Sequence, residues 1–333
     1  MEKRLNMAKK IKLVYILGAS HSGTTLTAML IGAHPEICTV GELKVTSLGD
    51  LTKYRCSCHK KILDCGFWQN ITKSMTDKGT NFDLENPGTD YKSCDSSYVK
   101  KLLKPLHRSV FLEMIRDIAL SLSPTWRKCY RRIQKQNTNL LKSISEQTGN
   151  DIIVDSSKIG IRLKYLLKNP DIDVYVVRVV RDGRGVLLTY VNPSEFADSQ
   201  NPELRQGGMG GNREDEKIPF DKAMHEWMRS NMEAEEVLKT VADDRKIKIK
   251  YEELCLNTQE TLKTIFEFIG VDSNRMNMDF KSVDHHVIGN GMRLDTSSKI
   301  NLDERWKEIL TQEQLKEFEE IAGNLNKGLG YIN

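Results

Sequence analysis

The sequence lacks the features that mark membrane and secreted proteins. No apolar run approaches the roughly 18 residues that a membrane-spanning helix needs. The apolar stretch behind the basic start, residues 11–17, is too short for a signal peptide and contains Lys12. The seven cysteines are an odd number in a chain of 333 residues, which fits a reducing compartment better than a disulfide scaffold. We therefore expect a cytoplasmic protein without a membrane span.

A strong charge of either sign is also missing. The formal net charge is only +4, while 29% of the residues are charged and 39% are hydrophobic, as in an ordinary soluble enzyme. This mildly basic balance favours anionic ligands but falls far short of the basic bias of a nucleic-acid-binding protein. We therefore expect no nucleic-acid partner.

Short apolar segments alternate with helical patterns, which is typical of a mostly parallel sheet covered by helices. The predicted strands are 12–17, 37–40, 151–154, 174–180 and 247–250. The predicted helices are 24–32, 98–121, 132–146, 160–167, 183–191, 221–240, 258–269 and 311–325. We expect an α/β fold in which a P-loop-like parallel sheet is flanked by helices, with helical and loop insertions.

The whole chain, 1–333, is predicted to be a single domain with two unusual segments. Residues 52–97 are polar and hold four of the seven cysteines, which indicates an insertion. Residues 192–219 carry the run Gly207-Gly-Met-Gly-Gly211 among polar residues and prolines, which predicts a mobile loop.

The strongest motif is GASHSGTT, residues 18–25, placed directly after a predicted strand and before a predicted helix. A glycine-containing turn at a helix N-terminus directs backbone N–H groups at an anion, and small hydroxyl residues donate further bonds to phosphate oxygens. Thr24 stands where nucleotide-hydrolysing P-loops need lysine, so the loop fits a single 5′-phosphate better than a triphosphate. The predicted phosphate-binding residues are Ser20, His21, Ser22, Gly23, Thr24 and Thr25.

Other polar residues follow the remaining predicted strands. Glu42 follows the second strand, 155–158 follows the third, 181–184 follows the fourth, and 251–253 follows the fifth. Ligands of such sheets bind beyond the carboxyl ends of the strands. We therefore expect these residues to outline one anion-binding site together with the phosphate loop.

The sequence SGTTL at 22–26 resembles the 5′-phosphosulfate loop of sulfotransferases that use 3′-phosphoadenosine-5′-phosphosulfate (PAPS), especially bacterial-type relatives of the tyrosylprotein and carbohydrate branch. Family members usually carry Lys or Arg before that serine, and this chain has His21. The sequence RDGRGVLLT at 181–189 resembles the family's 3′-phosphate motif. The resemblance implies that Arg181 and Thr189 bind the 3′-phosphate and that His21 assists the leaving group.

Two weaker similarities lie later in the chain. IKYEEL at 249–254 resembles a segment in which the tyrosine, here Tyr251, lies near the nucleotide. HVIGNGMR at 286–293 resembles a late loop that closes over the nucleotide. This likeness implies that Arg293 contacts the 3′-phosphate and that Asn290 turns the loop.

The resemblance also implies the reaction. Glu42 matches the family's general base, and the acceptor is a hydroxyl on a glycan, a peptide tyrosine or a small alcohol. In-line sulfuryl transfer needs a base and cations for the developing charge, so we expect no metal requirement and release of 3′-phosphoadenosine-5′-phosphate (PAP). Candidate acceptor-binding residues are Lys158, His225 and Trp227. Two alternatives remain, a nucleotide kinase in which Asp155 is a Walker B aspartate and a non-catalytic nucleotide-binding module.

The insertion offers four possible zinc ligands, Cys56, Cys58, His59 and Cys65. The Cys-x-Cys spacing is unusual for a structural zinc site. Reduced cysteines packed near Phe67 and Trp68 are therefore favoured, and no metal is predicted.

Overall fold

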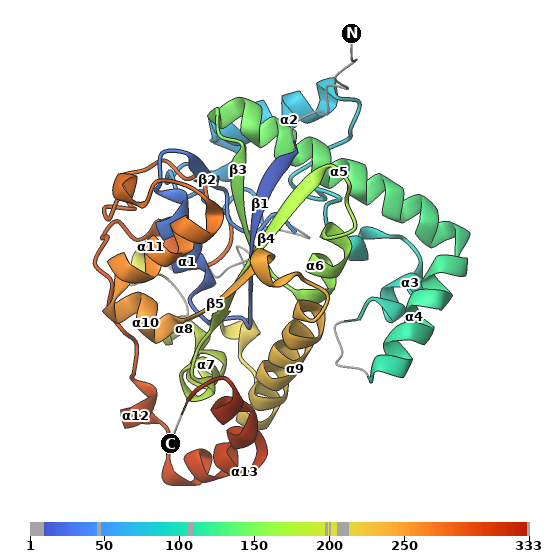
Figure 1. Ribbon diagram of the computed structural model, residues 1–333. Coiled ribbons are helices and arrows are strands. Elements are labelled where there is room, and N and C mark those ends of the chain that lie inside the picture. The colour runs from blue at the N-terminus through green and yellow to red at the C-terminus, as the bar shows by residue number, and fades with distance from the viewer. Residues whose placement is uncertain are drawn as a thin grey trace.

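A five-stranded parallel sheet forms the centre of the molecule (Figure 1). The computed structural model describes residues 10–44, 48–104, 109–196, 199, 201–204 and 213–331. Across the sheet, the strands are β2 (Ile37–Thr39), β3 (Ile152–Lys158), β1 (Ile11–Gly18), β4 (Ile172–Val180) and β5 (Lys246–Lys250), and all neighbours are parallel. The predicted α/β fold with a P-loop-like sheet is confirmed, and each of the five predicted strands is present.

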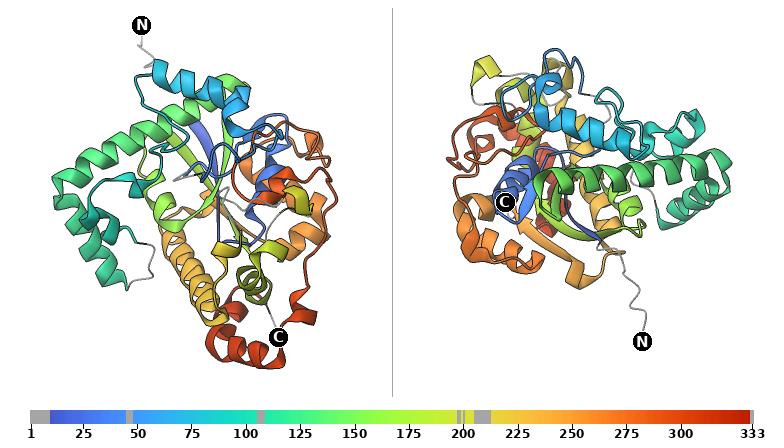
Figure 2. Two further views of the ribbon diagram at one scale, coloured as in Figure 1. Left: turned by 180° about the vertical axis from the view of Figure 1, so that it is seen from behind. Right: turned by 90° about the horizontal axis from the view of Figure 1, so that it is seen from above.

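Helices cover both faces of the sheet (Figures 1 and 2). One face carries α1 (Thr24–Gly32) and α11 (Thr258–Ile269), and the other carries α5 (Pro124–Thr148), α6 (Gly160–Leu166) and α9 (Phe220–Leu238). Side chains of the central strand alternate between these layers, as the pleat requires. Val14 and Ile16 belong to the buried cluster of α1 and α11, whereas Leu13 and Leu17 belong to that of α5, α6 and α9.

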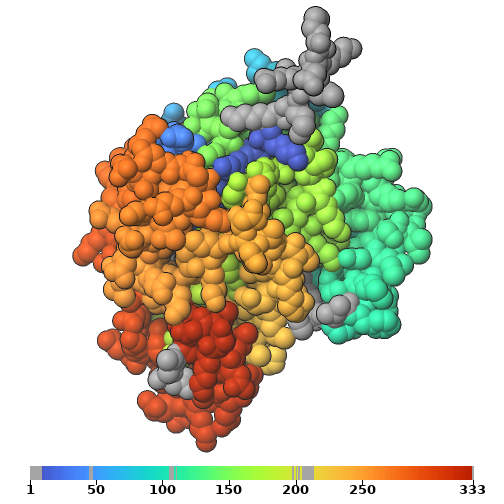
Figure 3. Space-filling model, in the orientation of Figure 1, coloured from blue at the N-terminus to red at the C-terminus, as the bar shows by residue number. Residues whose placement is uncertain are grey.

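A third buried cluster lies beyond the carboxyl ends of the strands, where α7 (Gly183–Val191) and α13 (Gln312–Gly328) pack with α9. The other helices are α2 (Gly66–Asp77), α3 (Ser97–Leu102), α4 (Val110–Leu122), α8 (Pro193–Phe196), α10 (Tyr251–Leu256) and α12 (Trp306–Ile309). In the space-filling view, α3 and α4 form a lobe at one side of the molecule (Figure 3).

Three predicted helices, 24–32, 183–191 and 258–269, have the predicted bounds. The helix predicted at 98–121 is instead two helices, α3 and α4, and Pro105 stands between them in the sequence. The helix predicted from 132 begins at Pro124, because the side chain of Ser123 accepts a hydrogen bond from the Trp126 amide and proline suits the first turn.

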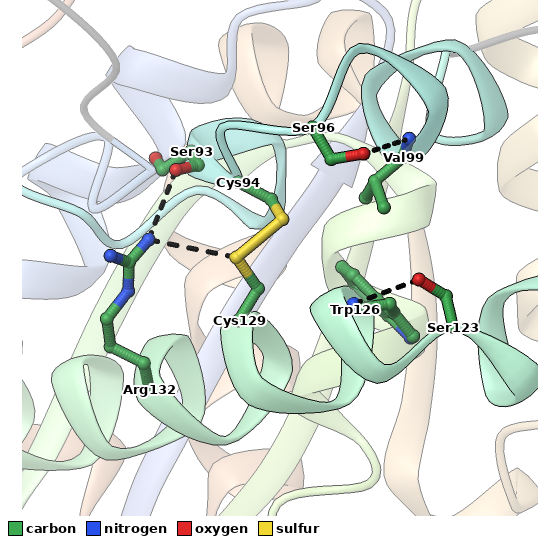
Figure 4. Close-up of a disulfide and its surroundings, with 8 residues drawn as sticks. All are labelled: Ser93, Cys94, Ser96, Val99, Ser123, Trp126, Cys129 and Arg132. Carbon is green, nitrogen blue, oxygen red and sulfur yellow. Dashed lines mark hydrogen bonds between the residues drawn. A yellow bond between two sulfur atoms is a disulfide. The ribbon is translucent and has the colours of Figure 1, made fainter.

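A disulfide joins Cys94, just before α3, to Cys129 in α5 (Figure 4). The two cysteines are 35 residues apart in sequence, and only the folded chain brings them together. This pair runs against the expectation that the odd cysteine count reflects a reducing compartment rather than a disulfide scaffold. Cys38, Cys56, Cys58, Cys65 and Cys255 form no disulfide.

The predicted insertion at 52–97 packs into the main core rather than standing apart from it. Tyr54, Ile62 and Trp68 belong to the same buried cluster as Leu13 of β1. The glycine-rich run of the second segment, 207–211, lies outside the described residues. Within the described residues, no helix combines the length and apolarity needed to cross a bilayer.

Strand β3 runs past the predicted end at 154 to Lys158 because its polar residues are satisfied inside the protein. Asp155 is fully buried and accepts hydrogen bonds from Arg162 Nε at 3.2 Å and Nη2 at 3.0 Å. The same carboxylate accepts the backbone N–H of Leu43 at 3.1 Å. This buried ion pair therefore ties α6 to the turn that follows β2.

Asp155→Asn is expected to destabilise the fold strongly, because it leaves the buried guanidinium of Arg162 without a counter-charge. Breaking one partner of a buried pair costs about 3–5 kcal/mol in the free energy of unfolding. Urea unfolding of this variant should be compared with that of Asp244→Asn, a control at an exposed ion pair. An unchanged midpoint for Asp155→Asn would show that the pair contributes nothing to stability.

Candidate functional site

A cavity of about 1010 Å³ lies at the carboxyl ends of the strands. All five strand-end loops contribute to its lining, with Ser20, His21, Gly23, Thr24 and Thr25 after β1, Glu42 and Lys44 after β2, Lys158 at the end of β3, Arg181 after β4 and Tyr251 after β5. The remaining lining residues are Leu26 of the following helix and residues between 189 and 199, at 215 and 216, and between 280 and 305. Each predicted strand-end group therefore contributes at least one residue to one cavity, whereas 155–157, 182–184, 252 and 253 do not line it.

Two residues with left-handed backbone shape the loop between β1 and α1. His21 has a φ of +62°, and Gly23, the N-cap of α1, has a φ of +79°. Backbone of this kind turns successive N–H groups toward an anion-binding concavity. A Cβ at Gly23 would lie 2.4 Å from Cδ2 of Tyr251, so the position requires glycine for space as well as for conformation.

The side chains of this loop divide between the cavity and the interior. Ser20, Thr24 and Thr25, three of the predicted phosphate-binding residues, line the cavity, whereas Ser22 is buried and does not. The ring of His21 packs edge-on against Tyr190, with 4.6 Å between the ring centroids. The cavity wall at the start of α1 therefore combines hydroxyls, an imidazole and the helix N-terminus.

The turn that carries Glu42 is held from both sides. Gly41 pairs with Ile288 of the late loop, and a Cβ there would lie 2.0 Å from the Ile288 carbonyl oxygen. Its φ of +85° also requires glycine. On the β3 side, the amide of Ser156 donates to the Gly41 carbonyl at 3.0 Å, and that of Lys44 donates to Ser157 Oγ at 2.9 Å. The backbone on both sides of Glu42 is therefore fixed by hydrogen bonds.

The Glu42 carboxylate lies between two lysines. Lys158 Nζ donates to Oε1 at 2.5 Å, and Lys44 Nζ is 3.6 Å from Oε2. Burial alone raises the pKa of Glu42, but the two ammonium charges outweigh it and lower the pKa to about 2. Lys158 has a left-handed backbone, φ +59°, which a non-glycine residue adopts only when its surroundings compensate the strain.

Arg181 connects the end of β4 to the phosphate loop. Its guanidinium donates to the His21 carbonyl at 2.8 Å and to the Asp303 carboxylate at 3.0 Å, and it stacks 4.5 Å from the ring centroid of Tyr251. Thr189 lines the cavity eight residues later, on α7, and its hydroxyl donates to the Val186 carbonyl at 2.6 Å. An arginine and a hydroxyl in this arrangement suit a phosphate group.

Three further predicted residues lie away from the cavity. Arg293 is buried over the ring of Tyr54 and donates to the carbonyls of Arg55 and Gly289, so the late loop presents Asn290 to the cavity instead. His225 is exposed on α9, where its Nδ1 lies 2.7 Å from the Asp221 carbonyl. Trp227 is buried against Phe318.

Several lining residues belong to no motif of the sequence, among them Lys44, Lys281 and Asp303. Lys44 stands two residues after Glu42, and this proximity in sequence is the signal that indicates a cation beside the carboxylate. Lys281 and Asp303 come from a late segment without strands. Burial lowers the pKa of Lys281 to about 8, and its ammonium donates to the Met292 carbonyl at 2.7 Å.

Comparison with known proteins shows the family. The family model of the sulfotransferase domain matches residues 12–330. The sulfotransferase domain of the olefin synthase from Synechococcus PCC 7002 has a similar fold, with 16% identity, coverage of 100% of this chain and 99% of that one, and a TM-score of 0.50. A sulfotransferase from Mycobacterium avium is 15% identical (98% and 78% covered, TM-score 0.47), and a mouse sulfotransferase complexed with PAP is 12% identical (96% and 89%, TM-score 0.45). No curated sequence matches the chain.

Lys158→Met is expected to raise the pKa of Glu42, because burial then acts with only the more distant Lys44 opposing it. Ionised Glu42 stabilises the fold above the ordinary carboxyl pKa, and this contribution is lost as the pH falls toward 2. Titration of ¹³C-labelled glutamate carboxyls, with Glu42→Gln assigning the signal, measures the change. Lys44→Met, whose ammonium is 3.6 Å away, is the matched control and should cause a smaller rise. A larger rise in the pKa of Glu42 in Lys44→Met than in Lys158→Met would contradict the conclusion that Lys158 is the main cause of the lowered pKa.

Proposed function

Since the chain belongs to the sulfotransferase domain family, we propose that it transfers a sulfuryl group from PAPS to an acceptor hydroxyl, with Glu42 as the general base. The observation that carries the proposal is that Glu42 shares one cavity with the phosphate loop and lies between Lys44 and Lys158. Family membership sets aside the kinase alternative, and Asp155, its candidate Walker B aspartate, is paired with Arg162 in the interior and does not line the cavity.

The two ends of the donor fit different parts of the cavity. The 5′-phosphosulfate lies at the N-terminus of α1, where Ser20, Thr24 and Thr25 offer hydroxyls and the helix offers positive potential. The 3′-phosphate lies at Arg181 and Thr189, beside the ring of Tyr251. Because Arg181 is paired with Asp303, the 3′-phosphate exchanges with that carboxylate or shares the guanidinium with it.

The transfer is an in-line displacement. Glu42 accepts the proton of the acceptor hydroxyl, the acceptor oxygen bonds to sulfur, and the bond from sulfur to the 5′-phosphate oxygen breaks to release PAP. His21 donates a hydrogen bond to the departing oxygen, and Lys158 neutralises charge on the equatorial sulfonate oxygens. The acceptor is a glycan, a peptide tyrosine or a small alcohol, and the step itself uses protein donors rather than a metal.

A carboxylate with a pKa near 2 is a weak base, and binding of PAPS increases the basicity of Glu42. The phosphosulfate competes with Glu42 for Lys158 and Lys44 and places negative charge beside the carboxylate. Both effects raise the pKa of Glu42 toward the working pH. The base therefore becomes effective only when the donor is bound, which limits proton abstraction to the productive complex.

Glu42→Gln is expected to keep nucleotide binding and lower turnover by about 10²- to 10⁴-fold, because the amide preserves size and hydrogen bonding but cannot accept the proton. Transfer from sulfur-labelled PAPS across a mixed panel of hydroxyl acceptors measures the effect. Asp295→Asn, at another carboxylate of the same cavity, is the control and should retain activity. Turnover of a folded Glu42→Gln protein at the wild-type rate would place the base elsewhere.

Arg181→Ala is expected to weaken PAP binding more than about tenfold, because a charge-assisted hydrogen bond to phosphate contributes roughly 1.5–3 kcal/mol. Affinity for AMP, which lacks the 3′-phosphate, should change much less. Isothermal titration calorimetry of both nucleotides with both proteins completes the comparison. Equal wild-type affinity for PAP and AMP would remove the 3′-phosphate site from this position.

A further inference from the structure

Three cysteines of the segment 56–65 lie close to His286, which stands more than 200 residues later in the chain. The ligand atoms of Cys56, Cys58, Cys65 and His286 all lie within 4.8 Å of one another. Cys56 and Cys65 are buried, and Cys58 and His286 are partly buried. Four such side chains around one point are the donor set of a structural zinc site.

The separations agree with tetrahedral zinc. Bonds of about 2.3 Å to sulfur and about 2.0–2.1 Å to nitrogen place tetrahedral sulfurs about 3.8 Å apart, and a sulfur and a nitrogen about 3.6 Å apart. Cys58 Sγ is 3.7 Å from Cys65 Sγ, and His286 Nδ1 is 3.8 Å from Cys56 Sγ and 3.4 Å from Cys65 Sγ. The space at the centre suits a single ion, because a multi-iron cluster needs its ligands farther apart.

The surroundings orient His286 toward the sulfurs. Its ring stacks on Phe67 with 4.6 Å between centroids and 6° between planes, and its carbonyl accepts the indole N–H of Trp68 at 3.2 Å. It also has a left-handed backbone, φ +50°, a strained conformation that the packing maintains. His59, the histidine nearest to these cysteines in sequence, is exposed and outside the group.

We propose that Cys56, Cys58, Cys65 and His286 bind one Zn²⁺ ion. With four protein ligands the coordination is closed, so the ion is structural and takes no part in sulfuryl transfer. This proposal departs from the prediction of no metal, which rested on the Cys-x-Cys spacing, because the fourth candidate ligand is His286 of a distant loop rather than His59.

The ion would fasten the segment 54–65 to the loop that forms one wall of the cavity. Several hydrogen bonds already join these segments, among them those from Val287 N to Ser57 Oγ at 2.8 Å and from Gly289 N to the Tyr54 hydroxyl at 2.8 Å. Two residues beyond His286, Ile288 pairs with Gly41, and the next residues, Gly289 and Asn290, line the cavity. Zinc binding therefore fixes both this wall and the turn that carries Glu42.

The test is the metal content of the full-length protein, purified without added metal and measured by inductively coupled plasma mass spectrometry. We expect close to one zinc per chain, and intense thiolate-to-metal and tetrahedral visible bands after exchange with Co²⁺. His286→Ala and Cys58→Ser should each lower the zinc affinity more than about 100-fold, beyond the loss typical of outer-shell changes. His59→Ala and Cys255→Ser are matched controls that should keep the metal.

Other outcomes would overturn the proposal, and none depends on an activity assay. These are a wild-type protein without zinc whose Co²⁺ form lacks thiolate bands, iron in place of zinc, or a Cys58–Cys65 disulfide found by peptide mapping. Loss of metal from His59→Ala with retention in His286→Ala would reject the ligand set. If His286→Ala does not fold, the wild-type content and the Co²⁺ spectrum still decide the question.

Discussion

The buried carboxylate of Asp155 organises the part of the molecule on which the cavity depends. It pairs with Arg162 in the interior and accepts the amide of Leu43, so the turn after β2 is fixed to β3. Arg162 in turn donates to the carbonyl of Thr89 at 2.8 Å, which connects the ion pair to the predicted insertion at 52–97. The ion pair of Asp155 and Arg162 therefore fixes the sheet, the segment 52–97 and the turn that carries Glu42 relative to one another.

The cavity keeps its charges in internal pairs. Glu42 is held by Lys158 and Lys44, and Arg181 is held by Asp303. The charged groups of these pairs are mostly shielded from solvent, and the attraction within each pair offsets the free-energy cost of their desolvation. An anionic donor would enter by exchanging partners in sites that are already formed, and the proposed activation of Glu42 follows from such an exchange.

Much of the fold follows from the sequence because the signals are local. The five strands and the phosphate loop depend on short apolar runs and on glycine, and parallel topology then sends Glu42, Lys158, Arg181 and Tyr251 to one edge. Properties that depend on distant packing escape this reasoning. The Cys94–Cys129 disulfide and the contact of His286 with Cys65 each join segments far apart in sequence. Arg293 matches a family motif, yet its packing on Tyr54 is set by tertiary structure.

The pairing of Arg181 with Asp303 also bears on how quickly a nucleotide leaves. Because Asp303 belongs to the same chain as Arg181, its carboxylate competes with the phosphate intramolecularly and has a high effective concentration. It pairs with Arg181 again as soon as the contact between the phosphate and the guanidinium breaks. In the proposed site it would shorten the residence time of the spent nucleotide, which keeps the 3′-phosphate that Arg181 recognises. Where product departure limits the turnover of an enzyme, tight recognition of that phosphate is a disadvantage, and a built-in competitor relieves it.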